Sequence, residues 1–507
     1  MQTRRVLTGY AEKWRCEPGE WMAWTASEAT RAAMMRAEPC GIVPSYVQQD
    51  HLRSSRVDGR PVARLGVTKF TVFERFDEAV MHRVFTDFLR AHTSFHTWFD
   101  RGADGDWIGR TLPADRLELT VAARGGSGDD IPGDGGHGTL KDFVFTHTRT
   151  PAEWSSFTFG VGDLQHATGA DPWFTIALAS DHLYTDGVSQ AITFIELLSR
   201  YSAAIAGVPY VEIPGRPYAA YAAEQRRRVG RLRCSDEVVQ RWRAAIVRSG
   251  GTTPSFPLSL GLAPGESAPG FMAADTEFIG PDVAERFACV VRSAGGGMNA
   301  GLLAVMAELH RRFTGSETFA MTLPRNDRPD PLDRFAVGWY VTLVPVHFEC
   351  PAGTAFADVV RVAQDALVEA RELDGVPIYP MIDLLRDDPA FGVEHGFAAP
   401  MLSYLDLTRL PGGELAAKHD FSVFGNSSPA REVFFWLNRH DGGLDYNAMH
   451  PDTPEAHAAI ARYVEEFRAV VTSLAETGGA EPGGLAAAGA LAAVGRGRRS
   501  AGRAPAA

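Results

Sequence analysis

His182 and Asp186 are the residues of this chain whose types and spacing best suit acid–base chemistry. They lie four positions apart in the sequence SDHLYTDG, which spans residues 180–187. A neutral imidazole on the floor of a cleft can take a proton from a hydroxyl or an amine near pH 7, and a nearby carboxylate can orient the ring or pair with an arginine. The same spacing also arises by chance around structural histidines. Gly187 favours a functional turn, because glycine allows positive φ and a close approach of backbones.

A strand and a helix flank this turn and would hold its side chains in place. Residues 173–179 form an uncharged apolar run of strand length, which predicts a buried strand. After the turn, apolar residues recur at steps of three and four, which predicts an amphipathic helix. They are Val188, Ile192, Ile195, Leu198 and Tyr201. Active groups are often placed between two such rigid elements.

The sequence of residues 180–187 resembles the HHxxxDG signature of the condensation-domain and chloramphenicol-acetyltransferase-like superfamily of acyltransferases. Within it, the chain most resembles the polyketide-associated-protein (Pap) acyltransferases of actinobacteria, of the type that acylates trehalose. The resemblance makes His182 the catalytic base and gives Asp186 and Gly187 structural roles. Asp181 stands where the superfamily has its first histidine, but the trehalose-acylating branch also carries Asp-His there. Because neighbours in an extended segment point to opposite faces, we expect Asp181 to be structural and not a second base.

A second segment of the chain resembles the other half of the condensation-enzyme site. It reads PRNDRPDPLDRFAVGWYVTLVPVHF over residues 324–348, with arginines after a strand and a glycine before the next one. In condensation enzymes an arginine in this place forms a salt bridge with the aspartate of the signature. The distance from Gly338 favours Arg328 as the partner of Asp186, with Arg325 as the runner-up.

Four residues are candidates for lining the substrate channel that this resemblance implies. Gln48 lies in VPSYVQQDHLR, residues 43–53, which is similar to a Pro-Ser-Tyr-Val-Gln segment of the trehalose-acylating relatives. Gly338, Trp339 and Tyr340 begin the second-half strand. The two aromatic side chains would either face the cleft or fill a core.

The resemblance covers about residues 40–475 and implies an α/β fold. We expect two chloramphenicol-acetyltransferase-like lobes set in a V, with an active-site channel between them and His182 midway along it. The expected boundaries are an N-terminal leader packed on the first lobe at 1–40, an N-terminal lobe at 41–249, a Gly/Pro/Ser-rich linker at 250–270, a C-terminal lobe at 271–475 and a disordered Ala/Gly/Arg tail at 476–507.

Composition excludes several other classes of protein. The chain of 507 residues is long enough for two or more cores, and its net charge of −12 argues against a nucleic-acid binder, which needs a basic face. No stretch approaches the ~20 consecutive apolar residues of a membrane span, and no apolar run follows the basic N-terminus, so we expect no secretory signal. The five cysteines lack CxxC spacing, which indicates neither zinc nor a disulfide framework and fits the cytoplasm.

These observations predict an acyltransferase that uses a thioester as its donor. The acyl group would arrive on CoA or on the phosphopantetheine arm of an acyl carrier protein, for example from a polyketide synthase. Neutral His182 would take the proton of a hydroxyl or amine acceptor and pass it to the leaving thiolate. The chain offers no nucleophile motif for an acyl-enzyme, and no metal or redox cofactor is implied.

Two further functions and two weaker contacts stay open. In the favoured hypothesis the protein acylates trehalose or another glycolipid sugar. The first alternative is a free-standing condensation enzyme that forms an amide or ester in natural-product synthesis. The second is a non-catalytic module that docks a carrier protein. The basic helix predicted at 218–228 is either a solvated helix end or a contact for an acidic carrier protein. The arginines of the C-terminal tail would allow weak contact with anionic lipid.

Overall fold

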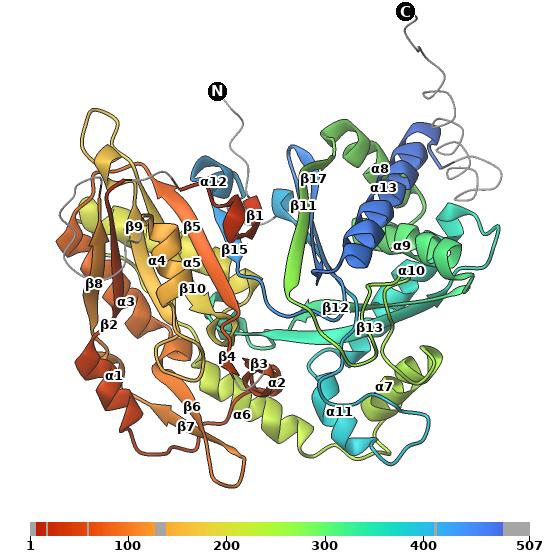
Figure 1. The fold of residues 1–507 in the computed structure, drawn as a ribbon, viewed down its shortest axis with the longest axis horizontal. Coiled ribbons are helices and arrows are strands. Elements are labelled where there is room, and N and C mark those ends of the chain that lie inside the picture. The colour runs from red at the N-terminus through yellow and green to blue at the C-terminus, as the bar shows by residue number, and fades with distance from the viewer. Residues whose placement is uncertain (1–6, 17–18, 58–59, 127–137, 410–412, 480–507) are drawn as a thin grey trace, which may run out of the picture.

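Two α/β lobes lie side by side in the computed structural model, which describes residues 7–16, 19–57, 60–126, 138–409 and 413–479 (Figure 1). Lobe 1 is built on a seven-stranded sheet and lobe 2 on a six-stranded sheet. In Figure 1, lobe 1 is on the left and lobe 2 is on the right. Two further pairs of short strands and two small helices lie outside these sheets. They are β3 (Arg56–Val57), β4 (Arg60–Pro61), β6 (Thr97–Arg101), β7 (Trp107–Thr111), α1 (Glu28–Met35) and α12 (Gly413–Lys418).

The strand predicted before the candidate turn lies at the centre of the lobe 1 sheet. The strand order is β1 (Leu7–Tyr10), β15 (Ser422–Gly425), β5 (Leu65–Val72), β10 (Phe174–Asp181), β9 (Phe157–Gly162), β2 (Trp21–Ala26) and β8 (Leu119–Gly125). β10 runs antiparallel to both neighbours, and all eight of its residues are buried. Burial on both faces explains why its sequence is continuously apolar and does not alternate.

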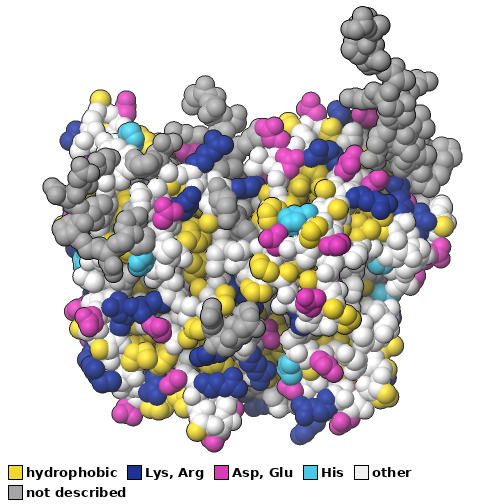
Figure 2. Space-filling model, in the orientation of Figure 1, with side chains coloured by type: hydrophobic (Ala, Val, Ile, Leu, Met, Phe, Trp, Pro, Cys, Tyr) yellow, Lys and Arg dark blue, Asp and Glu magenta, His cyan; other side chains and the backbone are white. Residues whose placement is uncertain are grey.

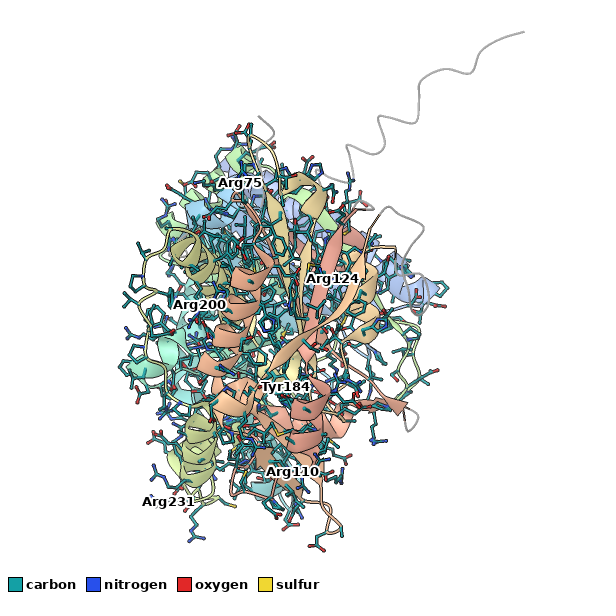
Figure 3. All side chains as sticks on the ribbon, turned by 90° about the vertical axis from the view of Figure 1, so that its left-hand side faces the viewer. Arg75, Arg110, Arg124, Tyr184, Arg200 and Arg231 are labelled. Carbon is teal, nitrogen blue, oxygen red and sulfur yellow. The ribbon has the colours of Figure 1, made fainter. Side chains whose placement is uncertain are left out.

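Helices cover both faces of this sheet. Ile176 and Leu178 pack in the same cluster as the apolar residues of α3 (Glu78–Ala91) and α5 (Gly187–Ile205). Ala177 and Ala179 pack on the other side with α4 (Leu140–His147). Successive residues of β10 therefore feed two different cores. The cluster with α3 and α5 is the larger one, and it contains Tyr184 of the candidate turn, which is labelled in the side view of lobe 1 (Figure 3).

The helix after the turn is present, but its buried face overlaps only partly with the predicted one. Leu198 and Tyr201 are buried as predicted, whereas Val188 and Ile195 are 39% and 38% exposed. Phe194 and Leu197 are buried as well. Phe194 packs edge-on against Phe70 of β5. Two apolar sets at helical spacing compete in this sequence, and the contact with the aromatic residues of the sheet selects the one that includes Phe194.

The sheet of lobe 2 is mixed, and its helices form most of the second core. The strand order is β11 (Gly270–Ile279), β17 (Gly443–Pro451), β16 (Phe434–His440), β14 (Met401–Asp406), β12 (Thr318–Asn326) and β13 (Val341–Glu349). The helices that contribute to the core are α7 (Glu237–Arg248), α8 (Pro281–Ser293), α9 (Met298–Thr314), α10 (Phe356–Ala370), α11 (Ile378–Leu384) and α13 (Pro454–Thr477). In Figure 1, α8, α9, α10 and α13 gather on the right of the sheet, and α7 and α11 lie below it.

The N-terminal segment is part of lobe 1 and not a leader packed on its surface, so this prediction was wrong. β2 pairs with β8 on one side and β9 on the other, inside the sheet. Trp21 and Trp24 are buried on its opposite faces, in separate cores. The predicted boundary at residue 40 overlooked that WMAWTA is itself a strand sequence.

The boundaries between the lobes also differ from the predicted ones. α7, which was assigned to the N-terminal lobe, buries Trp242 in the lobe 2 core, and Phe256 from the predicted linker is buried there too. In the opposite direction, β15 leaves lobe 2 and pairs with β1 and β5 in the lobe 1 sheet. These associations depend on pairing between distant segments, which local sequence patterns do not specify.

The C-terminal helix and the tail meet close to the predicted boundary. α13 continues to Thr477, two residues beyond the predicted end of the lobe. Apart from residues 476–479, the predicted tail lies outside the described residues. Within the described part of the chain, no helix has the length and apolar character needed to cross a membrane.

The two faces of α5 give a stability test of the fold. Phe194→Ala should lower the free energy of unfolding by about 3–5 kcal/mol, because it removes a buried ring and leaves a cavity. The matched change Ile195→Ala, on the exposed side, should cost less than about 1 kcal/mol. Urea unfolding monitored by tryptophan fluorescence measures both. Equal losses for the two variants would contradict the orientation of α5 described here.

Candidate active site

The turn that carries His182 is fixed by backbone hydrogen bonds and by two buried neighbours. β10 ends at Asp181, a short 3-10 helix spans His182–Tyr184, and α5 begins at Gly187. The His182 amide donates to the carbonyl of Arg64 over 2.7 Å, and the side chains of Leu183 and Tyr184 are fully buried. The His182 side chain is partly exposed between these anchors. Its position is therefore set by the backbone, while its ring stays reachable.

The imidazole of His182 is suited to act as a base. Burial lowers its pKa below the usual 6.5 and nearby His51 lowers it further, against smaller opposing effects of its own backbone, Asp181 and Asp186. Its Nδ1 atom makes no hydrogen bond to another described residue. The Trp339 ring lies against the imidazole, with 4.2 Å between ring centroids. A ring with a lowered pKa is neutral at pH 7 and can accept a proton.

Asp186 is buried, and the structure joins it to Arg328. Asp186 Oδ1 accepts hydrogen bonds from Arg328 Nη2 at 3.0 Å and from the Ser189 amide at 2.7 Å, so it also caps α5. Asp186 Oδ2 accepts from the Tyr340 amide at 2.9 Å. Both charged side chains are only 2% exposed. A buried pair of this kind is tolerated only when further hydrogen bonds satisfy both partners, as they do here.

Arg328 is held by several groups besides Asp186. Its guanidinium donates to the Ser189 hydroxyl at 2.9 Å and to the Asp333 carbonyl at 3.1 Å, and it lies over the ring of Tyr340. The runner-up, Arg325, instead pairs with Asp374 at 2.7 Å. Arg325 is inside β12, opposite Thr342, whereas Arg328 follows the end of that strand and is free to turn towards lobe 1.

Asp181 is fully buried, and both oxygens of its carboxylate are engaged by neighbouring groups. Its Oδ1 atom lies 2.6 Å from Nε2 of His51 and accepts from the Leu183 amide at 2.9 Å. Its Oδ2 atom accepts from the Arg64 amide at 2.9 Å. Burial opposes ionisation, but His51 and the two amides outweigh it and hold the pKa of Asp181 below its usual range. A carboxylate in this state is a poor base, and its hydrogen bonds are compatible with the structural role predicted for Asp181.

His51 was missed by the sequence analysis. It lies on α2 (Tyr46–Ser54) and is 1% exposed; its ring bonds to Asp181 and lies edge-on to Trp339. One signal was available: His51 follows Gln48 by three positions, which puts both on one face of a helix. Gln48 itself is buried and donates to the Leu183 carbonyl at 2.9 Å. Both residues of α2 therefore hold the turn that carries His182.

The remaining channel candidates divide between the site and a core. Gly338 exchanges two hydrogen bonds with the Ser189 hydroxyl, and a Cβ there would come within 2.3 Å of the Tyr218 ring. Trp339 contacts His182, as a site residue would. Tyr340 is 0% exposed and packs against Tyr218 and Tyr221, so of the two alternatives left open for it, it fills a core. Alternation along the strand start sends the two aromatic side chains to opposite sides.

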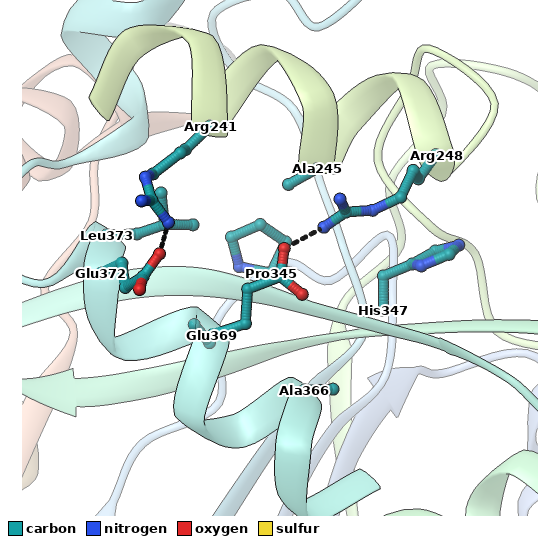
Figure 4. Close-up of a pocket in the computed structure, with 10 residues that line it drawn as sticks. Arg241, Ala245, Arg248, Pro345, His347, Ala366, Glu369, Glu372 and Leu373 are labelled. Atoms are coloured by element: carbon teal, nitrogen blue, oxygen red, sulfur yellow. Dashed lines mark hydrogen bonds and ion pairs between the residues drawn. The ribbon is translucent and has the colours of Figure 1, made fainter. Parts of the chain in front are cut away.

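Of two small cavities in the described structure, one adjoins this site and the other lies apart from it in lobe 2. One is lined by Gln48, Ser94 and Tyr218, among others, and adjoins the turn through Gln48. The other, shown in Figure 4, lies between α7 and the strand β13 in lobe 2 and contains none of the predicted site residues. Its arginines, Arg241 and Arg248, are paired with Glu372 and Glu369. We therefore place the candidate active site at His182.

Comparison with known proteins gives consistent matches over most of the chain. The family model described as "Condensation domain" matches residues 67–404. The chain is 26% identical to trehalose-2-sulfate acyltransferase PapA2 of Mycobacterium tuberculosis, over 91% of this chain and 96% of the relative. It is 27% identical to 2'-acyl-2-O-sulfo-trehalose (hydroxy)phthioceranyltransferase PapA1 of Mycobacterium bovis, over 95% and 91% of the two chains.

Solved structures share the fold. The structure titled "PapA2 acyl transferase" aligns with a TM-score of 0.83 at 24% identity, covering 93% of this chain and all of that one. The first condensation domain of the calcium-dependent antibiotic (CDA) synthetase aligns with a TM-score of 0.63 at 16% identity, covering 87% of this chain and 97% of that one. These alignments confirm the predicted fold class, two α/β lobes of the chloramphenicol-acetyltransferase-like type.

The Asp186–Arg328 pair makes a testable contribution to stability. Asp186→Ala and Arg328→Ala should each lower the free energy of unfolding by about 3–5 kcal/mol, because each leaves a buried charge without its partner. The double variant should lose less than the sum of the two single losses. Arg325→Ala is the matched control and should cost less than about 1 kcal/mol, since its ion pair is partly exposed. Strict additivity would show that the pair is not coupled.

Proposed function

The chain belongs to the condensation-domain family and is an acyltransferase, and on this basis we propose that it transfers an acyl group from a thioester to a sugar hydroxyl. The observation that carries the proposal is the partly exposed His182 on a turn that backbone hydrogen bonds hold in place, beside the ring of Trp339. The acceptor class is supported by the two relatives that have trehalose in their names, which cover most of this chain. We therefore take trehalose and its derivatives as the first acceptors to test.

The proposed reaction is a direct transfer with His182 as general base. His182 removes the proton of the acceptor hydroxyl while its oxygen attacks the thioester carbonyl. The C–S bond then breaks, and the imidazolium returns the proton to the leaving thiolate, which gives an ester and a free thiol. A lowered pKa favours this return, because a more acidic imidazolium is a better proton donor. The reaction exchanges one acyl bond for another and requires no redox cofactor.

The donor is proposed to be an acyl thioester of CoA or of a carrier protein. Lys and Arg side chains gather at the lower centre of the face in Figure 2, around the positions of α2 and α6 (Tyr218–Val229). On α6, Arg226 and Arg228 bond to the carbonyls of Pro44 and Gly375, whereas Arg227 is exposed. Part of the predicted basic patch is thus engaged in hydrogen bonds within the protein. Its exposed part suits the negative charge of either donor.

The substrate test is a panel of donors and acceptors. Purified protein is incubated with acyl-CoA or acyl carrier protein, and with trehalose, trehalose-2-sulfate or a simple amine, and products are identified by mass spectrometry. We expect an ester of a trehalose compound. Amide formation would support the alternative of a condensation enzyme in natural-product synthesis, and binding of carrier protein without any product would support the docking module.

Loss of the base should abolish most of the activity without unfolding the protein. His182→Ala should lower kcat by about 10²–10⁴-fold, the usual contribution of a positioned acid–base group. His166→Ala changes an exposed histidine and serves as the control, with activity close to the unchanged protein. Circular dichroism verifies that both variants are folded. A folded His182→Ala protein with undiminished kcat would disprove the assignment.

The pH dependence of kcat/KM provides an independent check on the base. A base is active when deprotonated, and the pKa of His182 is lowered. Activity should therefore persist below pH 6.5 and fall only at more acidic pH, where the imidazole gains its proton. An acidic limb centred above 6.5 would be inconsistent with His182 in the environment described here.

A further inference from the structure

The hydrogen-bond network behind the base leads from His182 to a second histidine. Asp181 precedes His182 in the chain, and its carboxylate holds the amides of Leu183 and Arg64. The carbonyl of Arg64 in turn accepts from the His182 amide at 2.7 Å. The third partner of the carboxylate is His51 of α2, with 2.6 Å between Nε2 and Oδ1. The backbone on both sides of His182 thus depends on how Asp181 is held.

The surroundings of His51 define which of its ring atoms carries the proton. Nη1 of Arg64 lies 3.4 Å from Nδ1 of His51 and donates to the hydroxyl of Ser54. A guanidinium can only donate hydrogen bonds, so the Nδ1 atom that faces it must be the acceptor and carry a lone pair. The proton of the neutral ring is then on Nε2, where it points at Asp181. His51 is 1% exposed, so no solvent competes for this hydrogen bond.

The two histidines also share an aromatic neighbour. The Trp339 ring lies edge-on to His51, with centroids 5.2 Å apart, and is tilted against His182, with centroids 4.2 Å apart. His51 therefore supports both the turn that carries the base and the ring that covers it. The HHxxxDG signature has an imidazole directly before the base, whereas this chain has Asp181 there and an imidazole from another helix bonded to it.

We propose that His51 is a positioning residue for His182, acting through the carboxylate of Asp181 in place of the first imidazole of the HHxxxDG signature. The inference deepens the proposed function and rests on it for the role of His182. Its geometric content, a base held through an Asp181–His51 pair, is independent of the donor and the acceptor. Besides the imidazole of His51, the titratable groups near His182 are the carboxylates of Asp181 and Asp186, and Arg328 is paired with Asp186.

Kinetics of two His51 variants, of Asp181→Asn and of the double variant His51→Leu/Asp181→Asn test the link in the intact chain. His51→Leu removes the donor to Asp181 and should lower kcat about tenfold to a hundredfold, because small displacements of a base are costly. His51→Gln keeps an N–H donor at the end of its side chain and should retain most of the activity. Asp181→Asn should have a mild effect alone but should improve His51→Leu, since it removes the stranded charge.

Titration of the His182 ring gives a readout that does not require turnover. Histidine ¹⁵N NMR follows the titration of His182, which should shift in His51→Leu because the turn that carries the ring is no longer held through Asp181. The control is His96→Leu, a buried histidine that bonds to the Leu89 carbonyl, and it should leave the His182 titration unchanged. If His51→Leu does not fold, the comparison of His51→Leu/Asp181→Asn with Asp181→Asn replaces it.

The outcomes separate this inference from the proposed function. A folded His51→Leu protein with unchanged kcat and unchanged His182 titration overturns the inference, as does a failure of Asp181→Asn to improve His51→Leu. A protein that acylates no sugar, but whose His182 titration still shifts when His51 is replaced, overturns the proposed function and leaves the positioning role intact.

Discussion

The buried ion pair between Asp186 and Arg328 is the interaction on which the rest of the site depends. Removing two charges from water costs several kcal/mol per ion, and only a full set of partners offsets that cost. Asp186 receives them from α5, from Arg328 after β12 and from the amide of Tyr340. One carboxylate therefore starts the helix behind the base, joins the two lobes and fixes the residues that follow Gly338.

The position of Trp339 is a direct result of this arrangement. The amide of Tyr340 is tied to Asp186, and Gly338 is tied to Ser189 on the first turn of α5. Trp339 lies between these two fixed residues, and its ring packs against His182. Lobe 2 thus contributes a ring to the site of lobe 1 through backbone contacts, and the aromatic cluster of Tyr218, Tyr221 and Tyr340 fills the space behind it.

Parts of the site that are formed by one continuous segment could be predicted from the sequence. Contacts between residues far apart in the chain could not be predicted from local patterns. β10, the turn and α5 follow from an apolar run and a change of period, and Arg328 followed from a resemblance. The pairing of His51 with Asp181 joins residues far apart in the chain, and the helical spacing of His51 from Gln48 does not identify Asp181 as its partner. The buried face of α5, the lobe membership of α7 and the burial of Tyr340 depend on which distant surfaces meet, so periodicity alone could not decide them.

The exchange of β15 into the lobe 1 sheet has a consequence for how the chain is made. β5 borders β15, and β1 has β15 as its partner in the sheet. During synthesis, one edge of β5 and the whole of β1 stay unpaired until residues 422–425 are available. At typical translation rates these residues leave the ribosome on the order of tens of seconds after β5. An open strand edge is a template for pairing with other chains. Lobe 1 therefore stays incomplete until most of lobe 2 has also been translated, although most of its own strands are made first. The open edge of β5 has to be protected in that interval.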